Sequence, residues 1–557
     1  MLKMVDGTGI IGVDMVCPLG GTVSPPQPPN YDNIEMEGVG SLMLPNSLKA
    51  TLERVELIGN SMQGENPAPD NPQEIKSAGR KSKNLFDITK LKKGAGANYP
   101  TEIELVGETL IAKKDGVTAN QMTFEIVLEN LEPNTTYEFT TKQIICKRKD
   151  SDTEKAGTIF SFKAYKNESQ IENKGNVFTT GESESDIYKI IFSVIAGDFG
   201  ALEYVKFEQP MLSHSGGSYE PYSDKCLFDV KVTGKNLLSN KPTDWQIGKR
   251  ISWSGYPEGA ITIYPVAKNA VNVISLKPST TYSIINNSGG IVINRIVERG
   301  LNKNGIKDHD VRSSKYTFVT NQNTMNAILQ FEKVDGTELL STDIEFIKIM
   351  LVEGEVNEPT PYEPYTEQAL TLTSDRPITK WDKLVEQDGQ IGWLYGSKIY
   401  VVTGNEIFEY RSGYDQDAYT NRFIVINDLF VNILNDKQLA YCKILKRVQY
   451  IYAQNKLEEG IDTNINQLHI KLSNDRIGVL SSDDTGTRTT KIIEYIKNTY
   501  TDGIEIMYMS NNSVFVPLPQ SEQTQLRNLH SYNGTTNITV DSGEVPCGIK
   551  LTYRKEI

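Results

Sequence analysis

The heptapeptide LEPNTTY at residues 131–137 recurs as LKPSTTY at residues 276–282, and this repetition decides how the chain is divided. The spacing of about 145 residues is the size of a whole domain and is too long for a solenoid unit of roughly 20–50 residues. Two further motifs, KNL upstream and YEPY downstream, flank both copies at residues 83–85, 219–222, 235–237 and 362–365. The sequence therefore predicts two tandem copies of one domain, at residues 81–224 and 225–366.

Each predicted domain has six or more short runs rich in apolar and β-branched residues, which Gly, Asn and Asp separate. This pattern, without a convincing helical period, is typical of a β-sandwich. The heptapeptide has a physical role in it, because proline marks the turn before a strand and β-branched Thr with Tyr begins the strand. We therefore predict a mostly β protein.

The segments outside the repeats have different compositions. Residues 1–45 are rich in Gly and Pro, with PPQPP at residues 25–29, and are interpreted as an N-terminal docking arm or as disordered chain. Residues 46–80 contain an alternating run at 52–58, which predicts a connector strand, and then a Pro-rich linker. Similar short connectors follow both YEPY motifs, so a rigid string of domains is expected.

Residues 367–557 do not repeat the earlier domains and predict a β-rich, α+β C-terminal domain. A helix is expected around residues 492–497, capped by Thr489 and Thr490, and a second around residues 521–529. The remaining apolar runs predict strands at residues 369–373, 399–403, 423–426, 467–471, 504–509, 514–518, 537–540 and 548–553.

Composition limits the class of function. The 557 residues carry a net charge of −13, which argues against nucleic acid as the main partner, since phosphate binding needs a basic surface. No run of about 18 apolar residues predicts a membrane span. The N-terminus does not resemble a signal peptide, so synthesis in a cytoplasm without Sec export is expected.

The sequence gives no strong signal for a metal or catalytic site. The five cysteines have no CxxC spacing and the four histidines no HExxH spacing. Asp308-His309-Asp310 and Asp483-Asp484 are candidates for metal ligation, but short acidic loops are more often solvated turns. No P-loop, GxGxxG or GxSxG motif is present, and no carboxylate pair has a recognisable spacing.

Aromatic residues cluster where a sugar could bind. Sugar recognition needs aromatic faces for the C–H side of the ring, with polar side chains for the hydroxyls. The second domain offers such a group, and the alternative is that Trp253 and its neighbours fill the core. The candidate glycan-binding residues there are Trp245, Trp253, Tyr256 and Tyr264.

The matching region of the first domain offers only Tyr99, so we expect the second domain to bind and the first to act as a spacer. Replacing Trp253 with alanine is expected to weaken binding to cell wall while leaving folding intact. Tyr414 and Tyr419, in the loop at residues 411–419, are further glycan candidates or belong to an oligomer interface.

Several motifs resemble tail-fibre and minor structural proteins of phages that infect Gram-positive bacteria. Prophage-derived contractile bacteriocins carry similar parts, and the resemblance covers roughly residues 46–557. It rests on KNLFD at 83–87, FEQPML at 207–212, the two YEPY motifs, LHSYNGTTNI at 529–538 and LTYRK at 551–555. In that family the tandem domains are similar to carbohydrate-binding-module jelly rolls.

The resemblance implies a non-enzymatic virion protein of the tail or baseplate, made in the host cytoplasm. Its expected partners are other tail or baseplate proteins and host cell-wall glycans, for receptor binding and host attachment. A homo-oligomer is implied, and trimers are common in tail fibres, although no heptad segment enforces one. A structural calcium ion is compatible with such modules but has no assigned ligands, and no other cofactor is expected. Two alternative functions are a polysaccharide depolymerase or hydrolase with accessory binding modules, and a purely structural baseplate component without a ligand.

Overall fold

The computed structural model describes most of the chain, apart from gaps in the N-terminal region and in several loops. The described residues are 5–6, 9–10, 31–37, 39–43, 49–61, 74–94, 98–114, 120–183, 185–196, 201–215, 219–254, 260–300, 304–311, 313–356, 361–410, 420–426, 440–445, 460–464, 467–480, 482–532 and 535–556.

The protein is mostly β, as the sequence predicts, and its strands form several antiparallel sheets. It divides into two compact units, residues 81–226 and the remainder. Arg80 and Leu227 form an antiparallel bridge with two backbone hydrogen bonds of 2.8 and 3.0 Å. The first unit is therefore an insertion whose entry and exit are tied together by the chain on either side. We call it the first sandwich.

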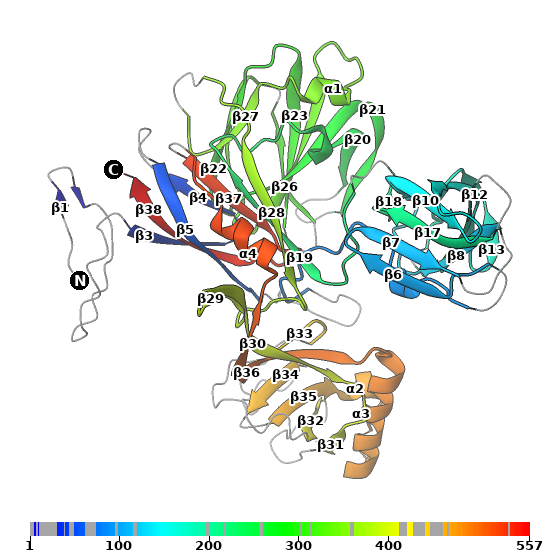
Figure 1. Cartoon of the computed structure of the whole chain (residues 1–557). Helices are drawn as coiled ribbons and strands as arrows, with labels where there is room; N and C mark the ends of the chain where they lie inside the picture. The colour runs from blue at the N-terminus through cyan, green and yellow to red at the C-terminus, as the bar shows by residue number, and fades with distance from the viewer. Residues whose placement is uncertain are drawn as a thin grey trace. The chain divides into compact units, whose positions relative to one another are not determined.

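The first sandwich contains three antiparallel sheets, in the orders β11-β10-β17-β7-β6, β13-β12-β16-β8 and β14-β15-β9-β18 (Figure 1). Phe124 lies at the centre of its core, with ring centroids 5.1 Å from Phe192 and 5.0 Å from Phe207. The elements are η1 (Ile88–Lys90), β6 (Glu102–Val106), β7 (Thr109–Lys113), β8 (Gln121–Leu128), β9 (Thr136–Thr140), β10 (Gln143–Arg148), β11 (Glu154–Ala156), β12 (Thr158–Lys166), β13 (Ser169–Ile171), β14 (Asn173–Lys174), β15 (Val177–Thr179), β16 (Tyr188–Ile195), β17 (Leu202–Glu208) and β18 (Met211–His214).

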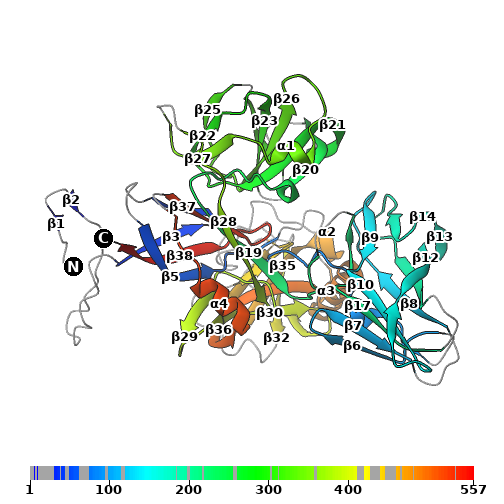
Figure 2. The ribbon, with the colours of Figure 1, turned by 45° about the horizontal axis from the view of Figure 1, so that its top comes forward.

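The second sandwich has two sheets, β20-β21-β26-β23-β24 and β25-β22-β27, which face each other across one apolar core (Figure 2). Buried residues from both sheets, such as Tyr282 and Phe331, meet in that core. The elements are η2 (Pro242–Asp244), β20 (Trp245–Ser254), β21 (Ala260–Ser275), β22 (Thr281–Asn286), β23 (Ile291–Arg299), β24 (Gly305–Asp310), β25 (Lys315–Val319), β26 (Asn326–Lys333), α1 (Ser341–Ile344) and β27 (Ile349–Glu353).

The repeated heptapeptide makes the same hydrogen bonds in both sandwiches. The hydroxyl of Tyr137 accepts from a backbone N–H five residues upstream at 3.1 Å, and that of Tyr282 does so at 2.9 Å. The hydroxyl of Thr180 accepts from the Thr135 N–H at 2.9 Å and donates to the Glu132 carbonyl at 2.6 Å. Thr320 makes the equivalent bonds in the second copy, at 2.8 and 2.6 Å. The heptapeptide is thus a hydrogen-bonded corner rather than a surface motif.

The KNL motif also has one structural role in both copies. The buried Asn84 amide donates to the carbonyls of Pro210 and Glu220, and its oxygen accepts from the Phe86 and Leu212 N–H groups. Asn236 makes four equivalent bonds in the second sandwich. Each asparagine therefore ties the first segment of its sandwich to the last. The two copies share one plan, which confirms the sandwich class, whereas jelly-roll connectivity stays a prediction.

The predicted connectors belong to one antiparallel sheet of eleven strands, which we call the hub sheet. Two of its neighbouring strands, β28 and β19, lie directly after the YEPY motifs. In spatial order the strands are β28 (Glu367–Ser374), β19 (Cys226–Thr233), β37 (Thr535–Asp541), β4 (Val39–Met43), β3 (Tyr31–Glu37), β38 (Gly548–Glu556), β5 (Lys49–Ile58), β29 (Lys383–Gln387), β30 (Gln390–Val402), β36 (Ile504–Pro517) and β33 (Ala440–Cys442).

The hub sheet corrects the expected string of domains. Strands β3 and β4, within the predicted docking arm, pair with β38 and β37 from the other end of the chain. The connector strand β5 pairs with β38 over nine residue pairs, from Gly548–Ile58 to Glu556–Lys49. A connector leaves its backbone N–H and C=O groups unpaired, and pairing with distant strands satisfies them. The N-terminal and C-terminal segments thus form one sheet instead of separate modules. A further strand pair, β1 (Val5–Asp6) and β2 (Gly9–Ile10), lies nearer the N-terminus.

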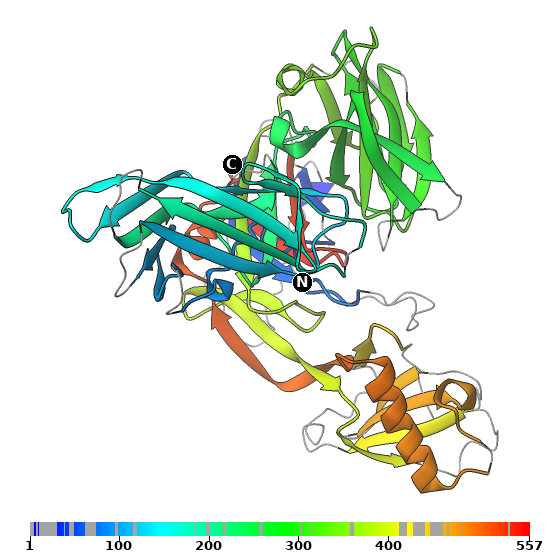
Figure 3. The ribbon, with the colours of Figure 1, turned by 90° about the vertical axis from the view of Figure 1, so that its right-hand side faces the viewer.

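The predicted C-terminal domain is interrupted by an α+β insertion that follows β30 and precedes β36. Its sheet has the order β31-β32-β35-β34, and α3 lies across one face of it (Figure 3). The helix predicted around residues 492–497 is present, but its N-cap is Asp484, which accepts from the Thr487 N–H at 2.7 Å. The elements are β31 (Ile407–Tyr410), β32 (Thr420–Ile426), β34 (Gly460–Asn464), β35 (Gln467–Ser473), α2 (Asn474–Ile477) and α3 (Thr485–Thr499), and α4 (Gln520–Arg527) follows β36.

Among the described residues, no helix combines the length and the apolar character that crossing a membrane requires.

Candidate functional site

Trp245, the first of the predicted glycan residues, belongs to the core of the second sandwich. Its side chain is 6% exposed, its ring centroid lies 4.3 Å from that of Phe331, and its indole N–H donates to the Ser239 carbonyl at 2.9 Å. The ring has no free face for a sugar, so the alternative of core filling holds for this residue. Trp245 follows η2 as Leu91 follows η1, and each of the two residues belongs to the core of its sandwich.

The other predicted aromatic residues lie outside what the structure describes. Trp253 and Tyr264 fall within β20 and β21, but their side chains are not among the described ones. Tyr256, Tyr414 and Tyr419 lie outside the described residues altogether. Their proposed contacts with glycans stay predictions.

The acidic segments considered for metal ligation have structural partners. Asp308 pairs with Arg295 at 2.7 Å, and Asp483 accepts from Lys491 Nζ at 2.6 Å. Asp484 caps α3. Over the described ranges no group of three His, Cys, Asp or Glu side chains is placed to hold a metal ion.

His309 forms part of a buried polar network on the core side of the second sandwich. Its Nε2 lies 2.6 Å from Glu298 Oε1, and its Nδ1 lies 3.2 Å from the Tyr316 hydroxyl. The second oxygen of Glu298 accepts from the Asn321 N–H at 2.6 Å and from the Thr324 hydroxyl. Burial by itself raises the pKa of Glu298, but these hydrogen bonds outweigh burial and hold the pKa below its ordinary value of 4.5. The network stabilises the fold by satisfying a charge that water cannot reach.

This network predicts a pH-dependent contribution to stability. Because the folded pKa of Glu298 is lower than the unfolded one, the contribution is complete above about pH 4.5 and is lost as the pH falls through the folded pKa. We expect Glu298→Gln to cost about 1–3 kcal/mol of unfolding free energy at pH 7 and less at pH 3. Urea denaturation of both proteins between pH 3 and 7 measures the difference. A difference that does not shrink toward pH 3 would contradict this assignment.

The most distinctive surface of the first sandwich is the outward side of β8, β12 and β16, which we call the open face. It carries the side chains of Thr123, Glu125, Phe160, Ser161, Tyr165, Lys189, Ile191 and Ser193, opposite the buried phenylalanines of the same strands. The alternation of β8, with every second residue buried, sets this division between core and surface.

Glu125 is the fixed acceptor of the open face. Tyr99 donates its hydroxyl to Glu125 at 2.6 Å, and Lys92 Nζ lies 3.1 Å from the same carboxylate and 4.6 Å from the centre of the Tyr99 ring. Burial raises the pKa of Glu125, but the hydrogen bonds from Tyr99 and Lys92, with the charges of Lys92 and Lys189, lower it overall. The carboxylate is therefore ionised and held in one orientation near neutral pH.

A bulge brings an aromatic ring to the open face. The pairing of β12 with β16 shifts register between Ile159 and Ser161, so Phe160 is the extra residue. Because Ile159 and Phe162 both point into the core, Phe160 and Ser161 both point outward, and the Phe160 ring is 66% exposed. Tyr165, with Lys189 Nζ 5.2 Å from its ring centre, lies further along the same strand.

The second sandwich covers its equivalent face with its own chain. Strand β20 folds over the sheet, where the Ile251 N–H donates to Gln330 Oε1 at 2.8 Å. Ile251 is buried in a small apolar cluster with Val271, Val297 and Ile328. A bulge occurs here too, in β23 opposite β26, but its extra residue is Asn294, which is 9% exposed and accepts from Gln330. The same fold thus has one open face and one covered face.

Sequence reasoning did not identify Phe160 as an exposed residue. The alternation of inward and outward residues along β12 does not assign position 160 clearly to the core or to the surface. It also expected the second domain to be the binding one, since tryptophans are found there. A register shift is set by pairing with another strand, so no local pattern in β12 could have identified the outward ring.

Comparisons with known proteins add little to this geometry. No family model matches the chain, and no curated protein sequence matches it. A search of solved structures found the cryo-EM structure of a mutant of the arabinofuranosyltransferase AftD from Mycobacteria, at 8% identity and a TM-score of 0.12. The match covers 80% of this chain and 33% of that one, so this chain spans about a third of that length. A TM-score this low carries no argument about fold or function.

Proposed function

We propose that this chain is a structural protein of a phage tail or of a phage-tail-like particle, and that the open face of its first sandwich binds glycans on Gram-positive cell surfaces. The tail assignment rests on the resemblance of the sequence motifs. The choice of surface rests on one observation, the exposed Phe160 ring on a face that also carries the fixed Glu125 carboxylate and that the second copy covers.

The chemistry of the open face suits a saccharide. A flat aromatic ring packs against the C–H side of a sugar, and carboxylate, ammonium and hydroxyl groups bond to its hydroxyls. Glu125, Lys189 and Ser161 supply these three kinds of group on the three strands, and Lys189 also pairs with Glu168. The net charge of −13 disfavours strongly anionic polymers as ligands. A neutral or weakly charged polysaccharide fits these conditions best.

The second sandwich then acts as a spacer, the reverse of the assignment that the sequence favoured. Weak sugar sites gain from avidity, so an oligomer within a tail or baseplate would raise the apparent affinity. Other tail or baseplate proteins would be its assembly partners, and the virion its location.

The open face predicts a binding defect without a folding defect. Phe160→Ala is expected to weaken binding of the full chain to Gram-positive cell walls roughly threefold to tenfold, the loss of one aromatic contact. The 66% exposure of Phe160 means that the midpoint of thermal unfolding should change little. Cell-wall pull-down titrations and a glycan array measure the binding.

The chain offers two matched controls for this experiment. Phe346 is 77% exposed but lies in the second sandwich, and Tyr204 lies on a different sheet of the first sandwich with Lys206 Nζ 4.8 Å from its ring centre. Alanine at either position should leave binding unchanged. Equal losses in all three variants, or none in Phe160→Ala, would reject the open face. New reducing ends released from the polysaccharide would favour a depolymerase instead.

A further inference from the structure

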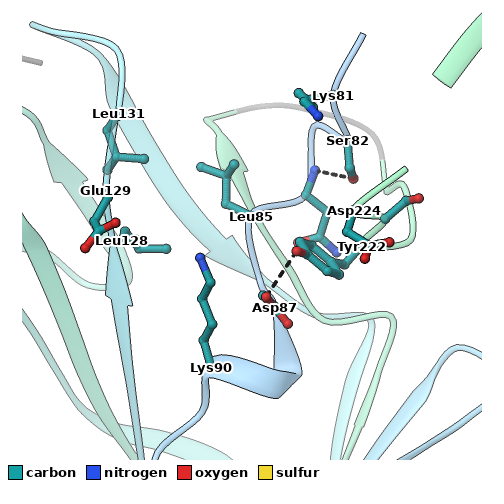
Figure 4. Close-up of a pocket in the computed structure, with 12 residues that line it drawn as sticks. Lys81, Ser82, Leu85, Asp87, Lys90, Leu128, Glu129, Leu131, Tyr222 and Asp224 are labelled. Atoms are coloured by element: carbon teal, nitrogen blue, oxygen red, sulfur yellow. Dashed lines mark hydrogen bonds between the residues drawn. The ribbon is translucent and has the colours of Figure 1, made fainter. Parts of the chain in front are cut away.

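The first sandwich contains a pocket close to where its chain begins and ends. Its volume is about 290 Å³. Its lining includes three leucines, a tyrosine, three carboxylates and two lysines, which Figure 4 draws.

Asp87 is the most firmly held of the charged groups. One of its oxygens accepts from the Thr89 N–H at 2.9 Å and from the Thr89 hydroxyl at 2.6 Å, while the other accepts from the Tyr222 hydroxyl at 3.1 Å. Burial and this last hydrogen bond raise the pKa of Tyr222 to about 12, so the phenol stays protonated. The carboxylate and the ring thus form one rigid wall of the pocket (Figure 4).

Two of the other charged side chains at the pocket, Lys90 and Glu129, are exposed and belong to no ion pair among the described residues. Within the described parts of the chain, their side chains also make no hydrogen bond, and the Lys90 ammonium points toward the leucine side of the pocket (Figure 4). Leu85, Leu128 and Leu131 form an apolar surface opposite the Asp87–Tyr222 wall (Figure 4). An apolar surface with a few converging polar groups is the usual composition of a small-ligand site.

The second sandwich keeps the scaffold of this region but not its chemistry. The residues that shape it recur, since Asn84, Leu131 and Tyr222 match Asn236, Leu276 and Tyr365 in the aligned motifs. Three of the charged ones do not: Ser239, Pro242 and Ile274 stand where the first copy has Asp87, Lys90 and Glu129, whereas Glu367 matches Asp224. The hydroxyl of Tyr365 donates to Glu367 instead. The charges at positions 87, 90 and 129 are therefore not required by the fold.

We propose that this pocket is a second saccharide site, which holds a single neutral pyranose ring such as a chain end or a branch residue. The proposal rests on the proposed function and adds a ligand class to the same sandwich. A volume of about 290 Å³ is at the lower end of ligand pockets, roughly 300–1,000 Å³, so one ring fits and a chain does not. The carboxylates accept hydrogen bonds from adjacent hydroxyls, the ammonium groups donate to ring or hydroxyl oxygens, and Tyr222 and the leucines contact C–H groups. Because the lining carries both carboxylates and ammonium groups, it favours neither a strongly anionic nor a strongly cationic ligand.

Saturation-transfer NMR on the full chain, with glucose, galactose, rhamnose, N-acetylglucosamine, glucosamine and glucuronate at millimolar concentration, tests this site. At least one neutral sugar should receive saturation. Asp87→Ser together with Glu129→Ile, which imports the residues of the second copy, should weaken that binding tenfold or more. Because Asp87 also begins η1, the exposed pair Lys90→Gln and Glu129→Gln is tested separately, and threefold or greater weakening is expected there.

The outcomes separate this proposal from the open face. The pocket is supported if monosaccharide binding persists in Phe160→Ala and is lost in the pocket variants. This holds even if cell walls are not bound. The proposal is overturned if no sugar receives saturation. It is also overturned if only the charged sugars, glucosamine and glucuronate, receive it. Saturation that is unchanged in both sets of pocket variants also overturns it, because the sugar would then bind elsewhere.

Discussion

Replacing Trp245 with alanine is expected to lower the unfolding free energy of the second sandwich by about 3–5 kcal/mol, the largest effect of any single substitution considered. The indole is 6% exposed and packs against Phe331, so its removal leaves a cavity that this well-packed core fills only in part. It also leaves the Ser239 carbonyl, which accepts the indole N–H, without that bond. Urea denaturation followed by circular dichroism measures the change.

A control for this substitution lies in the same sandwich. Phe346 is 77% exposed, so Phe346→Ala should shift stability by less than about 0.5 kcal/mol. If Trp245→Ala lost less than about 1 kcal/mol and also lost affinity for glycans, the indole would be a ligand contact and the core assignment would be wrong.

The sequence could predict the two sandwiches because the information that specifies them is local and occurs twice. The LxPxTTY corner is closed by its own hydrogen bonds, and the KNL asparagine bonds to the YEPY segment within each copy, so the recurrence of these motifs predicts a shared fold. The role of Trp245 was also accessible in principle, since it follows η2 as the buried Leu91 follows η1. Residue type alone, a tryptophan among polar residues, pointed instead to the surface.

The hub sheet and the open face could not be predicted in the same way. Ile34 pairs with Leu551, and Leu57 with Ile549, and strand patterns identify strands but not such distant partners. The run at 548–553 predicts a strand, yet its position between β3 and β5 depends on pairing that no motif encodes. The exposure of Phe160 likewise depends on how β12 is paired.

The hub sheet predicts that deleting residues 548–556 unfolds much of the protein but spares the first sandwich. Strand β38 is paired on both sides, and its Ile549 and Leu551 side chains are 0% exposed. Truncating one such side chain costs about 2–5 kcal/mol of unfolding free energy. Losing the whole strand is therefore expected to cost most of the roughly 5–15 kcal/mol that stabilises a domain. The first sandwich has its own core, formed within residues 86–212, and does not depend on β38.

Limited proteolysis with mass spectrometry, combined with calorimetry, distinguishes these parts. The deletion should leave a protected fragment near residues 81–226 and one thermal transition, while the transition of the hub sheet disappears. Deleting residues 1–10 is the matched control, because the described strands there, β1 and β2, pair only with each other, and both transitions should remain. A truncated chain that kept every transition at its original temperature would show that the sandwiches and the C-terminal insertion fold as independent units. The expected string of domains would then hold after all, because a domain whose core is complete by itself does not respond to the loss of a strand outside it.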